Sequence, residues 1–169
     1  MNRRRFLAVG AGSAALLAAG GWWWSTQSGQ PKRAALQTPA ARVLITALIP
    51  AVVGQPDGKP LAGAELAAAA DRMLATMAGL PLSAQDELGE LFGLLDNSAF
   101  RRLAAGISTP WEQATPEALA QFLQSWRTHS LSLLQVGYHA LHDLAAGSFY
   151  ADPSTWGPTG YPGPHIQFS

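Results

Sequence analysis

Two Thr-Pro pairs, each leading into apolar side chains at helical spacing, constrain the fold more than any other feature of the sequence. In Thr38-Pro39 and Thr115-Pro116, the threonine hydroxyl suits the N-cap of a helix and the proline suits its first helical position. Apolar residues at i, i+3, i+4 and i+7 follow the second pair, namely Leu119, Phe122, Leu123 and Trp126. This spacing places them on one face of a helix.

The composition also favours helix. Alanine and leucine are abundant and β-branched residues are few, which favours helix over strand. Cysteine is absent, which excludes disulfides, thiolate metal sites, iron–sulfur clusters and covalent haem attachment through Cys-x-x-Cys-His. We therefore expect an all-α fold, a small bundle of four to six helices over residues 38–147.

Local signals set the expected helix boundaries. Pro50 is expected to bend or end the first helix, and a second helix is expected from Ala62 or Ala64 to Met77. The segment Ser83-Ala84-Gln85-Asp86 resembles a capping box, with Asp in place of the usual Glu. Ser98 is expected to cap a short helix that continues to Ala105.

The last part of the bundle is expected to contain the helix after Thr115 and a helix over Ser130–Ala146. The pattern allows one long helix or a pair bent near Thr128. Gly147 suits the position just after the final helix, because glycine readily adopts a left-handed conformation there.

The N-terminus is typical of a twin-arginine export signal. Arg3 and Arg4 precede Phe6 and Leu7, and an uncharged run rich in Ala, Gly and Leu follows. We expect residues 1–24 to form a signal helix that the twin-arginine translocase recognises, with residues 25–37 as a linker. The protein is therefore predicted to reach the periplasm.

Three consecutive tryptophans leave the fate of this leader open. Trp22–Trp24 fit the flank of a signal that is removed, and they also fit an uncleaved anchor that lies at the interface of the inner membrane. Cleavage near Gly20 and cleavage near Ala34–Ala35 are both compatible with the sequence.

The charge balance argues against nucleic acid as a partner. The sequence contains 11 Lys and Arg and 11 Asp and Glu, with no acidic residue before Asp57. Three of the arginines precede residue 24, so the rest of the chain has 8 basic and 11 acidic residues and a formal charge of −3. Binding to nucleic acid needs clustered Lys and Arg, which this chain lacks.

The last 22 residues, 148–169, change in character, because proline, glycine and aromatic residues replace the helical pattern. We expect an extended tail without regular helix. Its aromatic side chains can pack onto the protein's own helices or dock on a partner protein. The candidate partner-binding residues are Phe149, Tyr150, Trp156, Tyr161 and Pro162.

Leader, body and tail together resemble the small subunit of membrane-associated, FAD-dependent sugar and alcohol dehydrogenases of the GMC type. The matching segments are the leader, Ala47-Leu48-Ile49-Pro50, and in the tail Phe149-Tyr150, Asp152-Pro153, Trp156 and Gly160–Pro164. Relatives of this kind are the gluconate 2-dehydrogenase subunit 3 family and the small subunits of sorbitol, fructose and glucose dehydrogenases. The segment between about Gly54 and Gly106 has no distinctive match.

The resemblance implies a function without catalysis in this chain. In that family the small subunit binds no cofactor and accompanies a large catalytic subunit that binds FAD. A multihaem cytochrome c subunit often passes the electrons to the membrane quinone pool. The small subunit is thought to act as a chaperone that assists folding and export of the large one.

Several polar clusters have an alternative interpretation as sites. His139, His142 and Asp143 lie at i, i+3 and i+4 and could hold a metal with His129 or His165, or simply form a solvated face near the helix end. Carboxylates at 86, 87 and 90 are expected to cap their helix. Arg101-Arg102 could bind a carboxylate of a partner or lie in solvent.

The leader and the body together favour the accessory role. A helical domain without cysteine or a cofactor motif has no need of a pathway that exports folded proteins. The signal is useful if it also carries a folded, FAD-loaded partner. The rival hypothesis is a free-standing exported metal-binding protein or enzyme that uses His139 and His142.

Overall fold

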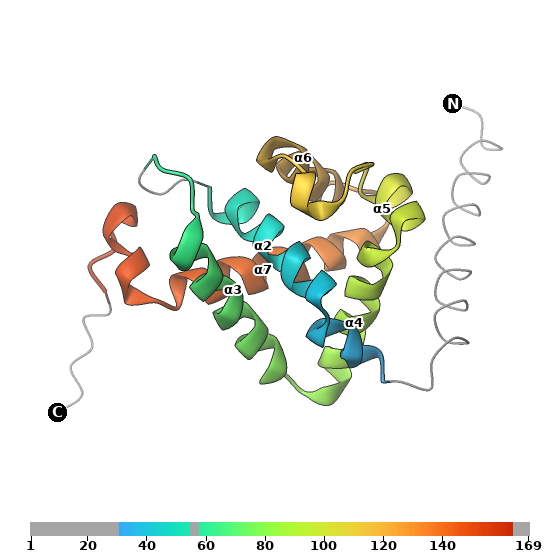
Figure 1. The fold of residues 1–169 in the computed structure, drawn as a ribbon, viewed down its shortest axis with the longest axis horizontal. Helices are drawn as coiled ribbons and strands as arrows, with labels where there is room; N and C mark the ends of the chain where they lie inside the picture. The colour runs from blue at the N-terminus through green and yellow to red at the C-terminus, as the bar shows by residue number, and fades with distance from the viewer. Residues whose placement is uncertain (1–30, 55–57, 164–169) are drawn as a thin grey trace.

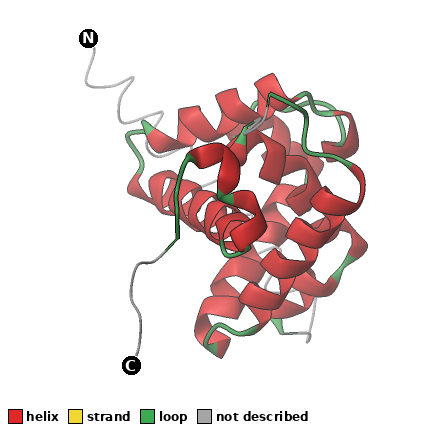
Figure 2. Ribbon diagram, turned by 90° about the vertical axis from the view of Figure 1, so that its left-hand side faces the viewer, coloured by secondary structure: helices red, strands yellow, loops and turns green. Residues whose placement is uncertain are grey.

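The computed structural model describes residues 31–54 and 58–163 of the chain. Every regular element in these residues is a helix (Figure 2). The α-helices are α2 (Pro39–Val53), α3 (Gly63–Ala78), α4 (Leu82–Asp96), α5 (Ser98–Ala104), α6 (Pro116–Arg127) and α7 (Ser132–Tyr150). The short 3-10 helices are η1 (Lys32–Gln37), η2 (Trp111–Gln113), η3 (Pro153–Thr155) and η4 (Gly157–Thr159). The predicted all-α fold is confirmed, while the predicted signal in residues 1–24 lies outside the described residues.

Helix α2 lies at the centre of the bundle (Figure 1). It packs against α3, α6 and α7, and it also contacts η1 and η2. Ile45, Leu48 and Ile49 of this helix are completely buried. None of the described helices has the length and apolar character that a membrane span requires.

The predicted start of α2 is confirmed, and of the two outcomes expected at Pro50, a bend or an end of the helix, the end is wrong. The Thr38 hydroxyl accepts a hydrogen bond from the Ala41 nitrogen at 3.2 Å, with Pro39 in the first turn. The helix continues through Pro50 to Val53. Because Pro50 lies in the last turn, the missing N–H costs a single helical bond. The Gly54 N–H then donates to the Pro50 carbonyl at 3.0 Å and closes the helix.

Helix α3 agrees with its predicted range, but the predicted capping box of α4 is wrong. Helix α4 begins at Leu82 after Pro81, and no side chain caps its N-terminus. Ser83 therefore lies within the first turn. Asp86 does not bond back to the helix start, because its carboxylate accepts hydrogen bonds from Arg33 in η1.

The predicted linker over residues 25–37 is likewise too long. Lys32–Gln37 form η1, which packs closely along α4 (Figure 1). Leu36 is buried there, with 6% of its surface exposed. The helical domain therefore begins at least as early as Lys32, because η1 belongs to the packed bundle.

In the C-terminal half of the bundle, one predicted helix cap is corrected, another is confirmed, and the choice between one long helix and two is decided. Asn97, not Ser98, caps α5, since its side chain accepts hydrogen bonds from the nitrogens of residues 99 and 100. The predicted cap of α6 is confirmed, because the Thr115 hydroxyl accepts a bond from the Ala118 nitrogen at 3.2 Å. Helices α6 and α7 form a pair that separates at Thr128.

Helix α7 does not end at Gly147 as predicted. It continues for another turn to Tyr150, and Gly147 has no positive φ. The physical reason is burial, because Phe149 in this extra turn reaches the core and is 2% exposed. The predicted boundary between a bundle over residues 38–147 and a tail from residue 148 therefore moves to the end of α7.

Candidate functional site

The segment after α7 folds back over the end of that helix. We call residues 151–163 the C-terminal hook. The Trp156 indole N–H donates to the Tyr150 carbonyl at 2.7 Å, and the Thr155 hydroxyl donates to the Asp152 carbonyl at 2.7 Å. The 3-10 helices η3 and η4 form two successive turns of the hook. The prediction of an extended tail without regular helix is therefore wrong for residues 148–163, which include the end of α7 and two 3-10 helices.

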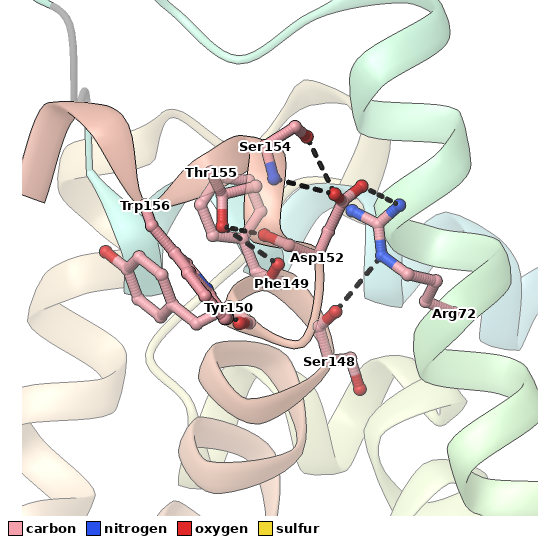
Figure 3. A network of polar contacts seen from close by, with 8 residues as sticks. All are labelled: Arg72, Ser148, Phe149, Tyr150, Asp152, Ser154, Thr155 and Trp156. Carbon is pink, nitrogen blue, oxygen red and sulfur yellow. Dashed lines mark hydrogen bonds and ion pairs between the residues drawn. The ribbon is translucent and has the colours of Figure 1, made fainter. Parts of the chain in front are cut away.

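An arginine from α3 holds the base of the hook (Figure 3). The Arg72 Nε donates to the Ser148 carbonyl at 3.2 Å, and its Nη1 lies 3.0 Å from Asp152 Oδ2. One guanidinium therefore binds the last turn of α7 and the first residue of the turn that follows. Such a two-point contact fixes direction as well as distance.

Asp152 also organises the turn that it begins. Its Oδ1 accepts hydrogen bonds from the Ser154 hydroxyl at 2.7 Å and from the Ser154 backbone N–H at 3.0 Å (Figure 3). These two bonds, and then the positive charge of Arg72, lower the pKa of the Asp152 carboxyl below its ordinary value of 3.8. The ionised carboxylate is thus the form that the folded hook favours.

The outer side of the hook presents aromatic and proline surface. The rings of Trp156 and Tyr161 meet edge to face with centroids 5.2 Å apart. Gly163 lies under the Trp156 ring, where an added methyl group would be 3.2 Å from Cζ3. Tyr161 is 51% exposed and Tyr150 is 36% exposed, and Pro162 is also exposed. The Trp156 ring is therefore held in place and partly covered, while Tyr161 and Pro162 face solvent.

Phe149 does not belong to this surface. It is 2% exposed and lies in the hydrophobic core beneath the hook. The other predicted partner-binding residues lie on the surface, where Trp156 joins the Tyr150 backbone to the Tyr161 ring. The structure therefore separates an internal anchor, Phe149, from an external aromatic surface.

The histidine cluster has a local, solvent-exposed arrangement. His142 Nδ1 lies 2.9 Å from Asp143 Oδ1, and both His139 and His142 pack against the Tyr138 ring. His129 instead accepts a hydrogen bond from the Leu131 nitrogen, and His165 lies outside the described residues. Among residues 31–54 and 58–163, no three His, Cys, Asp or Glu residues are grouped so that they could hold a metal ion.

The predicted helix-capping role of the acidic residues in α4 is wrong for two of them. Asp86 binds Arg33, and Glu90 accepts a hydrogen bond from Lys32, so both fasten η1 to the bundle. Arg101 lies over the Trp111 ring, with its Cζ 5.6 Å from the centroid, while Arg102 is exposed. The paired arginines therefore differ in environment.

Two shallow recesses lie on either side of Trp111, away from the hook. One, of about 250 Å³, lies between η1, α2 and α4, and the other, of about 580 Å³, lies between α2 and the start of α6. Alanine, proline and other apolar residues line most of both. Neither contains a histidine or a residue of the hook.

Sequence reasoning missed the residues that build the hook. Arg72 and Ser148 are 76 positions apart, and nothing in the helical pattern of α3 distinguishes Arg72 from a solvated arginine. The Asp152-Pro-Ser154 segment carries a detectable signal, because an aspartate side chain readily accepts the backbone N–H two residues on, as in an Asx turn. Comparisons with known protein families, with curated proteins and with solved structures found no match for the chain.

Proposed function

We propose that this chain is a non-catalytic accessory subunit that escorts and stabilises a FAD-dependent sugar or alcohol dehydrogenase of the GMC type. In this proposal the chain also supplies the twin-arginine signal that exports the complex to the periplasm. The observation that carries the proposal is the C-terminal hook. A hydrogen bond to the Tyr150 carbonyl holds the Trp156 ring, Arg72 holds the base of the hook, and Tyr161 remains 51% exposed.

A fixed and exposed aromatic surface suits protein recognition. Tyrosine and tryptophan bury large areas at interfaces, and few rotatable bonds mean that little entropy is lost on binding. In this protein the entropy lost on binding is reduced further, because the Trp156 indole is already hydrogen-bonded to the Tyr150 carbonyl before a partner binds. The hook therefore has the features of a preorganised contact surface.

The exposed face of α7 extends this surface. Val136, Asp143 and Tyr150 are spaced by seven residues, or about two turns, and so lie on the same side of the helix. Val136 is 64% exposed. Asp143 is the only Lys, Arg, Asp or Glu in the 19 residues of α7. A face with so little charge is compatible with burial against a large partner.

Co-purification tests the partner directly. The tagged full-length chain is purified from its native host, and the bound proteins are identified together with any flavin, by its absorbance and fluorescence. We expect a large flavoprotein with bound FAD. Recovery of the chain without any flavoprotein would contradict the proposal.

Matched variants test the surface. Tyr161→Ala removes an exposed ring of the hook, while Leu103→Ala removes an apolar side chain on α5 that is 70% exposed. We expect Tyr161→Ala to weaken flavoprotein binding by about tenfold or more, the effect of losing one interface anchor. Leu103→Ala should bind like wild type. Equal binding by all three proteins would exclude the hook as the contact.

The export role has a separate test. Replacing Arg3 and Arg4 with lysine retains the positive charge of the leader but removes the arginine pair. We expect the flavoprotein and its dehydrogenase activity to remain in the cytoplasm. Undiminished activity in the periplasm would show that the partner does not depend on this signal.

A further inference from the structure

The contact between η1 and α4 is too close to be an incidental packing of a linker. Gly89 of α4 lies directly against the backbone of η1. A methyl group built on Gly89 would overlap the Lys32 carbonyl and lie 2.7 Å from the Arg33 nitrogen, closer than real contacts allow. The absence of a side chain at this one position lets the two backbones meet.

Charged residues flank this glycine and match the two basic residues of η1. Gly89 and Glu90 follow Asp86 by three and four residues, so both lie one turn along the same side of α4 as Asp86. Arg33 Nη1 lies 3.1 Å from each carboxylate oxygen of Asp86, and Lys32 donates to Glu90. The Arg33 backbone N–H also donates to Asp86 at 3.1 Å.

The other end of η1 runs directly into α2. The Thr38 hydroxyl donates to the Ala35 carbonyl at 2.8 Å while it accepts the N–H that begins α2. Leu36 is buried between these two fixed points. The segment from Lys32 to Thr38 is therefore held by backbone, ionic and apolar contacts along its whole length.

We infer that the mature protein keeps Lys32–Gln37 docked on α4, and that processing of the leader is confined to residues before Pro31. A signal peptidase cleaves an accessible segment beside small residues. Ala34 and Ala35 are small, but they lie within η1. Cleavage there would remove Lys32 and Arg33 together with both ionic contacts. The inference therefore excludes cleavage near Ala34–Ala35 and is compatible with cleavage near Gly20 or with an uncleaved leader.

The N-terminus of the exported protein shows whether cleavage of the leader is confined to residues before Pro31. This test rests on the proposed export. The chain is isolated from the periplasm or the membrane and its N-terminus is determined by sequencing and intact mass. A start at or before Pro31, including an intact Met1, supports the inference. A start at Lys32 or at any later residue overturns it.

Trypsin tests the docking without any need for export or a partner. Trypsin cleaves after lysine and arginine, so Lys32 and Arg33 report on the opening of η1. We expect Gly89→Ala in the full chain to raise the rate of cleavage at these residues about tenfold, because proteolysis follows the population of the open form. Gly147→Ala is the matched control, since its added methyl group meets nothing within 4 Å.

Two outcomes of the trypsin experiment would overturn the docking. One is rapid cleavage after Lys32 and Arg33 in the wild type. The other is an equal rate in Gly89→Ala and Gly147→Ala. If Gly89→Ala does not fold, Asp86→Asn replaces it, because the amide keeps the shape of the side chain but loses its charge. A failed export experiment combined with the expected trypsin result would reject the proposed function and leave the docking intact.

Discussion

The two ends of the described chain are both 3-10 segments fastened to a neighbouring helix by an arginine and an aspartate. At the N-terminal end, Arg33 of η1 binds Asp86 of α4. At the C-terminal end, Arg72 of α3 binds Asp152 of the hook. The polar chemistry is the same, but the apolar side chains are used in opposite ways.

The N-terminal segment turns its apolar surface inward. Leu36 is buried and the η1 backbone lies against Gly89, so η1 contributes to the bundle itself. The hook has its apolar anchor, Phe149, in the helix before it and leaves Tyr161 and Tyr150 exposed. The two ends therefore differ in that η1 contributes a buried apolar side chain to the bundle, whereas the hook leaves an aromatic side chain, Tyr161, exposed.

The largest loss of stability is expected when Phe149, the buried ring beneath the hook, is replaced. Phe149→Ala should lower the free energy of unfolding by about 3–5 kcal/mol, the usual cost of removing a buried aromatic ring. Urea-induced unfolding followed by circular dichroism measures the change. A loss below about 1 kcal/mol would mean that the end of α7 is not part of the core.

A smaller loss is expected when the apolar anchor of the other end is removed. Leu36→Ala should cost about 2 kcal/mol, at the low end for a buried leucine, because η1 lies at the edge of the bundle. The same urea experiment measures this loss. Leu103→Ala, which changes an exposed leucine, is the control and should leave the midpoint unchanged. A cost for Leu36→Ala no larger than for Leu103→Ala would remove the distinction between the two ends.

The parts of this fold that the sequence predicted are those with local causes. The hydroxyls of Thr38 and Thr115 act on N–H groups three residues ahead, and the stripe of apolar residues in α6 is buried as its spacing indicates. Such signals lie within one or two helical turns of each other. They are therefore readable without knowledge of the tertiary structure.

The parts that were missed depend on residues far apart in the chain. Asp86 lies where a helix-capping carboxylate is expected, yet Arg33, 53 positions earlier, binds it. Gly147 has the residue type that ends a helix, yet burial of Phe149 carries α7 past it. In both places a tertiary contact outweighs a local preference, and a single sequence does not specify such contacts.

Arg72 of α3, which holds the base of the hook, should contribute more to the local order of the hook than to the free energy of unfolding of the whole domain. Arg72→Ala removes its bonds to the Ser148 carbonyl and to Asp152. We expect a loss of about 1 kcal/mol, since side chains that are about a third exposed are partly screened by water. Hydrogen exchange of residues 151–163 should accelerate more than that of α4. Arg42→Ala, which breaks the exposed pair with Asp71, is the matched control and should leave the hook unchanged.

Uniform acceleration of exchange across the whole bundle in Arg72→Ala would contradict this assignment. It would mean that the hook and the core unfold together. The external aromatic surface would then depend on global stability, and the contrast between the two ends would disappear.

The smallest effect is expected from acidification. The pKa of Asp152 is lowered by the Ser154 hydroxyl and backbone N–H and by Arg72, so folding favours the ionised carboxylate. The stabilisation is complete at pH values above the ordinary pKa of 3.8 and is lost as the pH falls below it through the lowered pKa. The NMR signal of the Trp156 indole N–H, which is bonded to the Tyr150 carbonyl, reports on the hook. It should weaken only in this acidic range.

Asp152→Asn is the variant that isolates this titration. Its amide cannot ionise, so the Trp156 signal should be weaker at neutral pH and should change little between neutral pH and pH 3. Asp71 also has a lowered pKa, because Arg42 bonds to it, and therefore titrates in the same acidic range. However, the Arg42–Asp71 pair joins α2 to α3 and makes no bond to the hook. A Trp156 signal that follows pH equally in wild type and Asp152→Asn would thus assign the change to the bundle and not to the hook.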